Sequence, residues 1–303
     1  MKISALLIAG LLLLGAGARP AHAQSIEEKQ IAAGKFSFDP AGGYIYLHAP
    51  FRQMGMLLKV PDQADIDAYK KDWDEAFTKA KAKYLRQLAS WESEKKQAAG
   101  GAGKVSAKPT EPTPETFTIG DIETRTKMMF GPQYVFSKDS VNNYYSYFMQ
   151  VKPGTYIYYG PITFDANAGF IGECYCMGSV KFEVKPGIIT DLGNFMMVAV
   201  FRTPPNHPRP DVTVTPEGTF LTMGKQKIEV GKLEWGLPAS LKSFPSVQAD
   251  FRAAGKMDNH FGITIGRLPA IPGILGYQRD KVIDLKAAGG SVAGTPVVGS
   301  AQP

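Results

Sequence analysis

Cys174, Cys176 and Met177 form the stretch of this sequence whose residue types and spacing suggest reactive chemistry. In an extended strand, residues two apart point to the same side, and their Cα atoms lie near the ~7 Å limit for a disulfide. The flanking Gly172 and Gly178 permit a tight turn that would bring the sulfur atoms together. Three alternatives follow: a local disulfide, two idle thiols, or a soft-metal site for Cu or Zn with Met177 as third ligand.

Further ligands for such a metal are scarce. Beyond residue 23 the sequence contains three histidines, His48, His207 and His260, and none has metal-ligand spacing to another. We therefore expect no cofactor, with Cu or Zn at the cysteine pair as the less favoured alternative.

Seven tyrosines between Tyr144 and Tyr175 form a second group. Alternation along a strand places Tyr145 and Tyr147 on one face, and Tyr156 and Tyr158 likewise share a face. If exposed, these four rings would form an aromatic surface that could bind sugar rings or a peptide. The alternative is that one set belongs to the core and the other covers a face beneath a helix.

Motifs of common enzymes are poorly represented. The sequence contains neither His-Glu-x-x-His nor a Walker A motif. Glu173, Glu183 and Asp191 lie near the central turns and would be the acids of a hydrolase acting on an envelope polymer. Isolated acids on sheets are usually solvated, so we expect a protein that is not an enzyme.

The segment Tyr144–Gly193 must position most of these residues. It contains Val-Lys-Pro-Gly twice, at Val151–Gly154 and Val184–Gly187, each time after an alternating apolar run. Pro presets φ and Gly accepts the positive φ of a type II turn, so the pattern predicts strand, turn, strand twice. With the other short strands, it predicts a mainly β fold, an antiparallel β-sandwich or open barrel over residues 24–61 and 117–230.

A change of period predicts one long amphipathic α-helix over residues 62–97, inserted between two strands. Asp62 is the expected N-cap, and Asp65 completes a capping box. At 1.5 Å per residue the helix would be ~50 Å long, which exceeds the length of a sandwich along its strands. Either its apolar stripe covers a sheet face, or its projecting end pairs with another helix or partner protein. The stripe residues for that contact are Trp73, Phe77, Tyr84, Leu88 and Trp91.

The remaining segments differ in composition. Residues 98–116 are rich in Gly, Pro and Thr and predict a disordered linker. Residues 231–286 are expected to form a C-terminal extension that packs on the sandwich. The small-residue segment 287–303 predicts a disordered tail. Nothing in the sequence indicates an oligomeric state.

Residues 1–23 read as a signal peptide. Lys2 is followed by the apolar run Ala5–Leu14, which is too short to span a bilayer, and an Ala-His-Ala motif places cleavage before Gln24. We expect a periplasmic or secreted protein. No later apolar run approaches eighteen residues, so no membrane span is expected. Removal of the signal peptide lowers the formal net charge from +6 to +4, and this mild charge does not favour nucleic-acid binding.

The order of motifs in the central segment resembles that of uncharacterised bacterial envelope β-sandwich domains, many of which are lipoproteins. The matching residues are Val-Lys-Pro-Gly-Thr-Tyr at Val151–Tyr156, the cysteine-bearing turn, and Phe182–Gly193. This chain departs from the pattern because it lacks a lipid-attachment cysteine and carries the inserted helix. The resemblance implies a β-sandwich and an envelope location, and it supplies no catalytic residues.

The expected function is therefore a binding or scaffolding role in the cell envelope, with another envelope protein as the partner of the inserted helix. A redox or soft-metal protein that uses Cys174 and Cys176 is the alternative.

Overall fold

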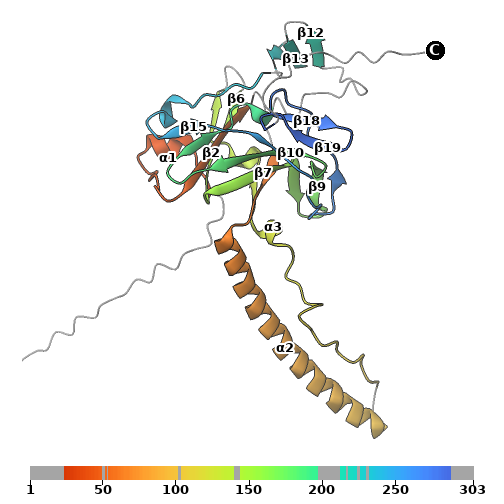
Figure 1. Cartoon of the computed structure of the whole chain (residues 1–303). Coiled ribbons are helices and arrows are strands. Elements are labelled where there is room, and N and C mark those ends of the chain that lie inside the picture. Colours follow the sequence, from red (N-terminus) through yellow and green to blue (C-terminus); the bar gives the residue numbers. More distant parts are fainter. Residues whose placement is uncertain are drawn as a thin grey trace, which may run out of the picture.

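The computed structural model describes most of the chain, as a β-rich body and one long helix that projects from it (Figure 1). The described residues are 24–49, 52, 54–101, 104–139, 144–196, 212–215, 218–223, 226–229 and 232–287. The predicted signal peptide, 1–23, and residues 288–303 of the predicted tail lie outside them.

Two facing sheets form the body. The first has the strand order β1 (Gln24–Ser25), β6 (Tyr144–Val151), β2 (Gly43–Ala49), β11 (Ile189–Asp191) and β15 (Ser246–Gln248), and β5 (Ser137–Asp139) also pairs with β6. The second has the order β16 (Arg252–Ala254), β10 (Ser179–Val184), β7 (Gly154–Gly160), β3 (Gly55–Lys59) and β4 (Lys127–Phe130). The mainly β prediction is thus confirmed, as open sheets rather than a closed barrel. The first sheet is mixed, because β11 runs parallel to β2 and β15.

Smaller elements surround the two sheets. A third sheet contains β8 (Ile162–Asp165), β9 (Gly169–Cys174) and β17 (Thr264–Ile265), a fourth contains β12 (Val212–Thr215), β13 (Gly218–Met223) and β14 (Gln226–Glu229), and β18 (Leu275–Gln278) pairs with β19 (Lys281–Asp284). The short helices are α1 (Glu28–Ala32), α3 (Ile122–Arg125), and the 3₁₀ turns η1 (Pro132–Tyr134) and η2 (Ala239–Leu241).

Both faces of each main sheet are covered. The largest apolar cluster lies between the sheets, where Ile45 and Leu47 of the first meet Tyr158 and Phe182 of the second. Alternate residues of the first sheet, such as Tyr44, point outward under a separate cluster of aromatic rings. For this reason β2 is buried almost continuously instead of alternating between buried and exposed residues.

The two Val-Lys-Pro-Gly segments are corners between the sheets. One carries the chain from β6 to β7, and the other carries it from β10 back to β11. They lie side by side, because Val184 is paired with Gly154 across β10 and β7. Gly187 has φ 65°, as a type II turn requires, whereas Gly154 has φ 142°, so the first corner is not a type II turn. The prediction of a strand on each side of both turns is confirmed, but neither turn closes a hairpin.

Helix α2 (Gln63–Ala99) begins at the predicted cap. The Asp65 amide donates to Asp62 Oδ1 at 2.9 Å, and the Asp62 amide donates to Asp65 Oδ2 at 3.3 Å. With 37 residues the helix is ~55 Å long. The alternative in which α2 covers a sheet face is wrong, because α2 runs away from the body (Figure 1). The outer sheet faces are already covered by other segments.

Residues 104–118 run back beside α2 to the body (Figure 1). We call α2 and these residues the arm. The sequence predicts a disordered linker over 98–116, but the structure has contacts with the helix there: Trp91 Nε1 donates to the carbonyl of Ser106 at 2.9 Å, and Lys81 pairs with Glu111 at 2.7 Å. The aromatic stripe of α2 needs cover from water, and the returning chain supplies it.

The C-terminal residues 232–287 pack on the body. Leu241 belongs to the outer cluster of the first sheet, and Phe251, Leu268 and Leu275 belong to the cluster between the sheets. These side chains are at most 1% exposed.

Candidate functional site

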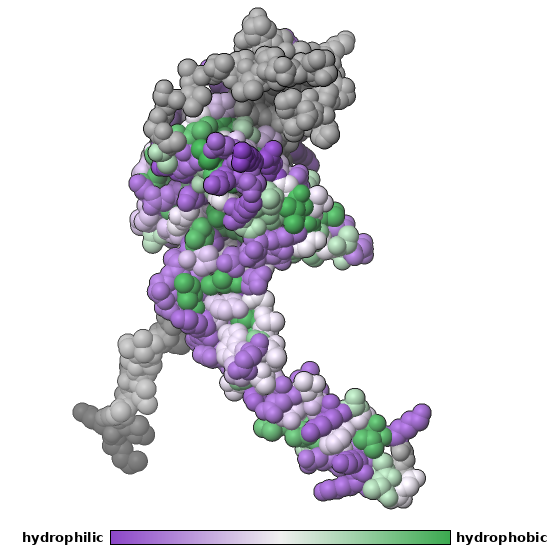
Figure 2. All heavy atoms as spheres, turned by 45° about the vertical axis from the view of Figure 1, so that its right-hand side comes forward, coloured by the Kyte–Doolittle hydropathy of each residue, from purple (hydrophilic) through white to green (hydrophobic). Residues whose placement is uncertain are grey.

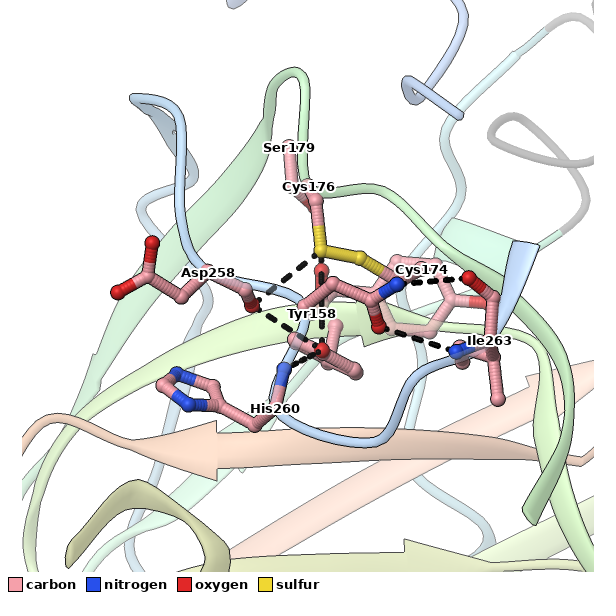
Figure 3. Close-up of a disulfide and its surroundings, with 9 residues drawn as sticks. Tyr158, Cys174, Cys176, Ser179, Asp258, His260 and Ile263 are labelled. Atoms are coloured by element: carbon pink, nitrogen blue, oxygen red, sulfur yellow. Dashed lines mark hydrogen bonds between the residues drawn. A yellow bond between two sulfur atoms is a disulfide. The ribbon is translucent and has the colours of Figure 1, made fainter. Parts of the chain in front are cut away.

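Cys174, at the end of β9, and Cys176 form a disulfide (Figure 3). Their Cα atoms are 5.2 Å apart, within the range for such a bond. The turn closes where the amide of Gly178 donates to the carbonyl of Tyr175 at 3.1 Å. The structure therefore has the first of the three alternatives for this pair, a local disulfide.

The disulfide is sealed beneath residues 255–266. Cys174 is 0% and Cys176 3% exposed, and Phe261 packs against their cluster. Cys176 Sγ lies 3.4 Å from the carbonyl oxygen of Asp258 (Figure 3). A thiol-exchange reagent must reach a sulfur atom in line with the bond, so this burial favours a structural role over a redox role.

Met177, the expected third metal ligand, does not belong to this buried cluster, because it is 40% exposed. Both sulfur atoms are bonded to each other, so neither offers a thiolate to a metal. Across the described part of the chain, no group of three or more His, Cys, Asp or Glu side chains is placed to hold a metal ion.

Of the two alternatives for the tyrosines, the exposed aromatic surface is wrong. Tyr145, Tyr147, Tyr156 and Tyr158 are between 0% and 9% exposed, and all four point into the cluster between the sheets. Strand alternation correctly grouped each pair, but it could not show that both sheet faces are covered. The rings are therefore core residues.

The three acids considered for a hydrolase lie in three different sheets. Glu173 is in β9, Glu183 in β10 and Asp191 in β11. Asp191 is buried, and burial raises its pKa although its carboxylate accepts the amides of Gly193 and Gly236, both at 2.8 Å. This carboxylate holds two loops, and the arrangement does not bring the acids together for general acid–base chemistry.

The sequence analysis did not predict a cluster of polar side chains on the outer face of the first sheet. His48 lies opposite Ser146, and Asp191 lies beside Tyr46, so the four side chains share one face. Burial lowers the pKa of His48 to about 4, although the ring donates to the carbonyl of Glu234. The imidazole is therefore neutral at pH 7. These residues are brought together by strand register alone, and no local sequence motif indicates that they are neighbours.

An ionic cluster fixes the arm to the body. Lys59, at the end of β3, is 3% exposed, and its Nζ lies 2.6 Å from Asp62 Oδ2 and 2.5 Å from Asp65 Oδ2. Lys152, in the first Val-Lys-Pro-Gly corner, adds a contact of 3.3 Å with Asp65. The first turn of α2 is thus bound to two separate elements of the body, strand β3 through Lys59 and the Val151–Gly154 corner through Lys152.

Charges in this cluster support one another. Burial disfavours the ionised form of Asp65, but the hydrogen bonds and charge of Lys59 outweigh it and lower the pKa of Asp65. Burial likewise opposes the charge on Lys59, whereas Asp62 and Asp65 raise the pKa of that ammonium group. All three groups are ionised at neutral pH.

A cleft of about 540 Å³ opens beside this cluster, between the base of α2, α3 and β4. Tyr156 and Met128 are apolar parts of its wall, and Lys59 and Asp65 are charged parts. At its edge Arg125 pairs with Asp72 at 2.6 Å. The most buried charges here are paired with each other, so the cleft is best understood as the joint between arm and body.

The stripe of α2 predicted to contact a partner helix is partly covered by the chain itself. Its residues Trp73, Phe77, Tyr84, Leu88 and Trp91 are each partly buried. Phe117 of the returning segment lies with its ring centroid 5.6 Å from Trp73 and 5.4 Å from Phe77. The arm therefore presents its polar and charged side to its surroundings, together with Leu85 and Val105, which are 61% and 40% exposed, and with the uncovered parts of the stripe.

No protein-family model, no curated protein and no solved structure matches this chain. The resemblance to envelope β-sandwich domains remains a hypothesis based on the Val-Lys-Pro-Gly motifs.

Proposed function

We propose that this chain is an exported, non-enzymatic binding or scaffolding protein of the cell envelope, in which the arm is the contact element. The observation that carries the proposal is the arm itself, ~55 Å of helix that is attached to the body only at its base. Asp65 is the one residue of α2 that is buried.

Beyond the ionic cluster at its base, the arm adds little to the stability of the body. Ordering a residue costs about 1–2 kcal/mol of conformational entropy, and in a globular protein burial against the core offsets this cost. In the arm the offset comes from its own returning segment, through contacts such as those of Trp73, Phe77 and Phe117. Such a self-supporting projection is suited to contact something beyond the body.

One observation supports export. A buried disulfide is typical of proteins in oxidising compartments. Within the part of the chain that the structure describes, no helix is apolar enough over a sufficient length to cross a bilayer.

A shortened arm tests the contact role. Residues 80–112 are replaced by Gly-Ser-Gly, which keeps the ionic cluster and the contact of Trp73 and Phe77 with Phe117. Both forms are exported, cross-linked in cells and recovered from the envelope fraction. We expect the full arm to capture a discrete envelope component that the short form misses, at equal thermal stability of the body. Capture of the same component by the short form would contradict the proposal.

A further inference from the structure

Charge is divided sharply along the arm. Its first part, Asp62–Glu75, has six acidic and two basic residues, a formal charge of −4. The distal part, Lys79–Lys108, has eight basic and two acidic residues, a formal charge of +6, which equals the formal net charge of the whole chain. The basic part starts ~25 Å from the beginning of α2.

Most of this distal charge is uncompensated. Lys81 is paired with Glu111 at 2.7 Å, but no other basic side chain of the distal part forms an ion pair within the described residues. Those seven cations are all exposed to solvent: Lys79, Lys83, Arg86, Lys95, Lys96, Lys104 and Lys108.

The cations surround the arm instead of forming one groove. Lys79, Lys83 and Arg86 follow the spacing i, i+4, i+7 and share one side of α2, whereas Lys104 and Lys108 lie on the returning segment. Such a distribution fits a broad, planar and fluid anionic surface better than a shaped protein site with a fixed pattern of acids.

Apolar side chains accompany these cations. Leu85 is 61% and Val105 40% exposed. The Trp91 ring carries the Lys95 ammonium at 5.3 Å and the Lys108 ammonium at 5.9 Å from its centroid. Figure 2 shows hydrophobic surface among hydrophilic surface toward the far end of the arm. Trp, Leu and Lys together are typical of segments that lie at the headgroup level of a membrane.

We propose that the distal part of the arm docks on the surface of a lipid bilayer that contains anionic lipids. This inference rests on the proposed role of the arm as the contact element and identifies the surface that it contacts. Three of the six acids of the first part are paired with Lys59, Lys152 and Arg125, whereas the seven unpaired cations lie in the distal part, so the arm meets the membrane with its far end and holds the body away from it.

Vesicle sedimentation of the purified, signal-cleaved protein tests the proposal. The probes are phosphatidylcholine vesicles with and without phosphatidylglycerol, at low salt and at about 1 M NaCl, where the Debye length is about 3 Å. The arm variant combines Lys79→Gln, Lys83→Gln and Arg86→Gln, which lie on the solvated side and leave the capping box intact. The control combines Lys181→Gln and Lys185→Gln with Lys242→Gln, three exposed cations of the body.

We expect binding to the anionic vesicles only, weakened by salt. The arm variant should bind about 100-fold more weakly at low salt, since each cation near an anionic surface contributes about fivefold. The body variant should bind as the parent does. Equal losses in both variants would show that net charge alone is responsible and would overturn the proposal, as would the absence of binding to anionic vesicles.

A second measurement tests whether the distal part of the arm is the part that contacts the membrane. In a form with Trp73→Phe and Trp235→Phe, the remaining Trp91 should shift its emission to shorter wavelength on anionic vesicles and be quenched by brominated lipid. An unchanged spectrum with bound protein would place the contact elsewhere and would overturn the proposal.

The outcome separates this inference from the proposed function. If vesicles do not bind but the full arm still captures an envelope protein in cells, the membrane inference fails and the contact role stands. If the shortened arm recovers every component that the full arm recovers, the contact role itself fails.

Discussion

Replacing Asp65 by Asn should loosen the joint between arm and body. The side chain keeps its size but loses the charge that faces the buried Lys59 at 2.5 Å and Lys152 at 3.3 Å. Removing one partner of a buried ion pair costs about 3–5 kcal/mol, because a charge is left in a poorly solvated site. Asp62 remains beside Lys59 at 2.6 Å and is half-exposed, so we expect about 3 kcal/mol, at the lower end of that range.

Urea unfolding, followed by far-ultraviolet circular dichroism and by tryptophan fluorescence, measures this loss. The matched control is Asp67→Asn, in the same turn of α2, where the exposed carboxylate accepts a hydrogen bond of 2.8 Å from Gln63. We expect a change of at most about 0.5 kcal/mol there. If Asp65→Asn changes the free energy of unfolding no more than Asp67→Asn does, the ionic cluster does not stabilise the fold as we argue.

The pH dependence provides an independent check on the same cluster. The folded-state pKa values of Asp62 and Asp65 are lowered, so their contribution is present above about pH 4 and is lost as the pH falls through the folded pKa. The pKa of Lys59 is raised, so its contribution is complete below about pH 10 and is lost as the pH rises further. In Asp65→Asn the loss of stability below pH 4 should be smaller than in the parent protein.

Four other changes have defined outcomes. Replacing Cys174 and Cys176 together by Ala should lower the free energy of unfolding by only about 1.5 kcal/mol, because the loop is short, and thiol titration of the folded parent should find no free thiol. Gly193→Ala should abolish folding or cost more than about 3 kcal/mol, since φ is 59° and the new Cβ would lie 2.0 Å from the carbonyl oxygen of Glu234. Gly34→Ala, at φ 64° with no atom within 4 Å, should cost about 1 kcal/mol, measured by the same urea curves. His48→Gln should reduce the loss of stability between pH 6.5 and pH 4, because the folded protein resists protonation of His48 while the unfolded chain does not; equal acid sensitivity of variant and parent would contradict this.

Local chemistry made α2 the most predictable element. The period of its apolar residues and the Asp62–Asp65 capping box are contained in a few neighbouring residues, and both the element and its start are confirmed. The sequence limited the cysteine pair to three states, because their spacing permits a local bond but does not require it. Spatial proximity of the sulfur atoms depends on the turn that ends at Gly178.

The returning segment shows why the rest could not be predicted. Three aromatic donors of α2, Trp91, Trp73 and Tyr69, bind backbone carbonyls of Ser106, Phe117 and Gly120. Every residue has a carbonyl, so composition does not reveal that these will be used, and residues 98–116 still read as a linker. The parallel register of β11 and the burial of both sheet faces are also long-range properties. Burial of both faces is the reason why the four tyrosines are core residues and not an exposed surface.

The arm leaves and re-enters the body at two neighbouring strands, so its length can vary without a change in the body. β3 and β4 are hydrogen-bonded neighbours, with Met56 opposite Met129, and the arm departs after one and returns before the other. Its exit and entry therefore stay fixed whatever its length. Two extra helical turns, matched by about three extended residues on the way back, would carry the tip ~10 Å farther without displacing any residue of the body. The length of the arm can therefore change while its attachment to the body stays the same.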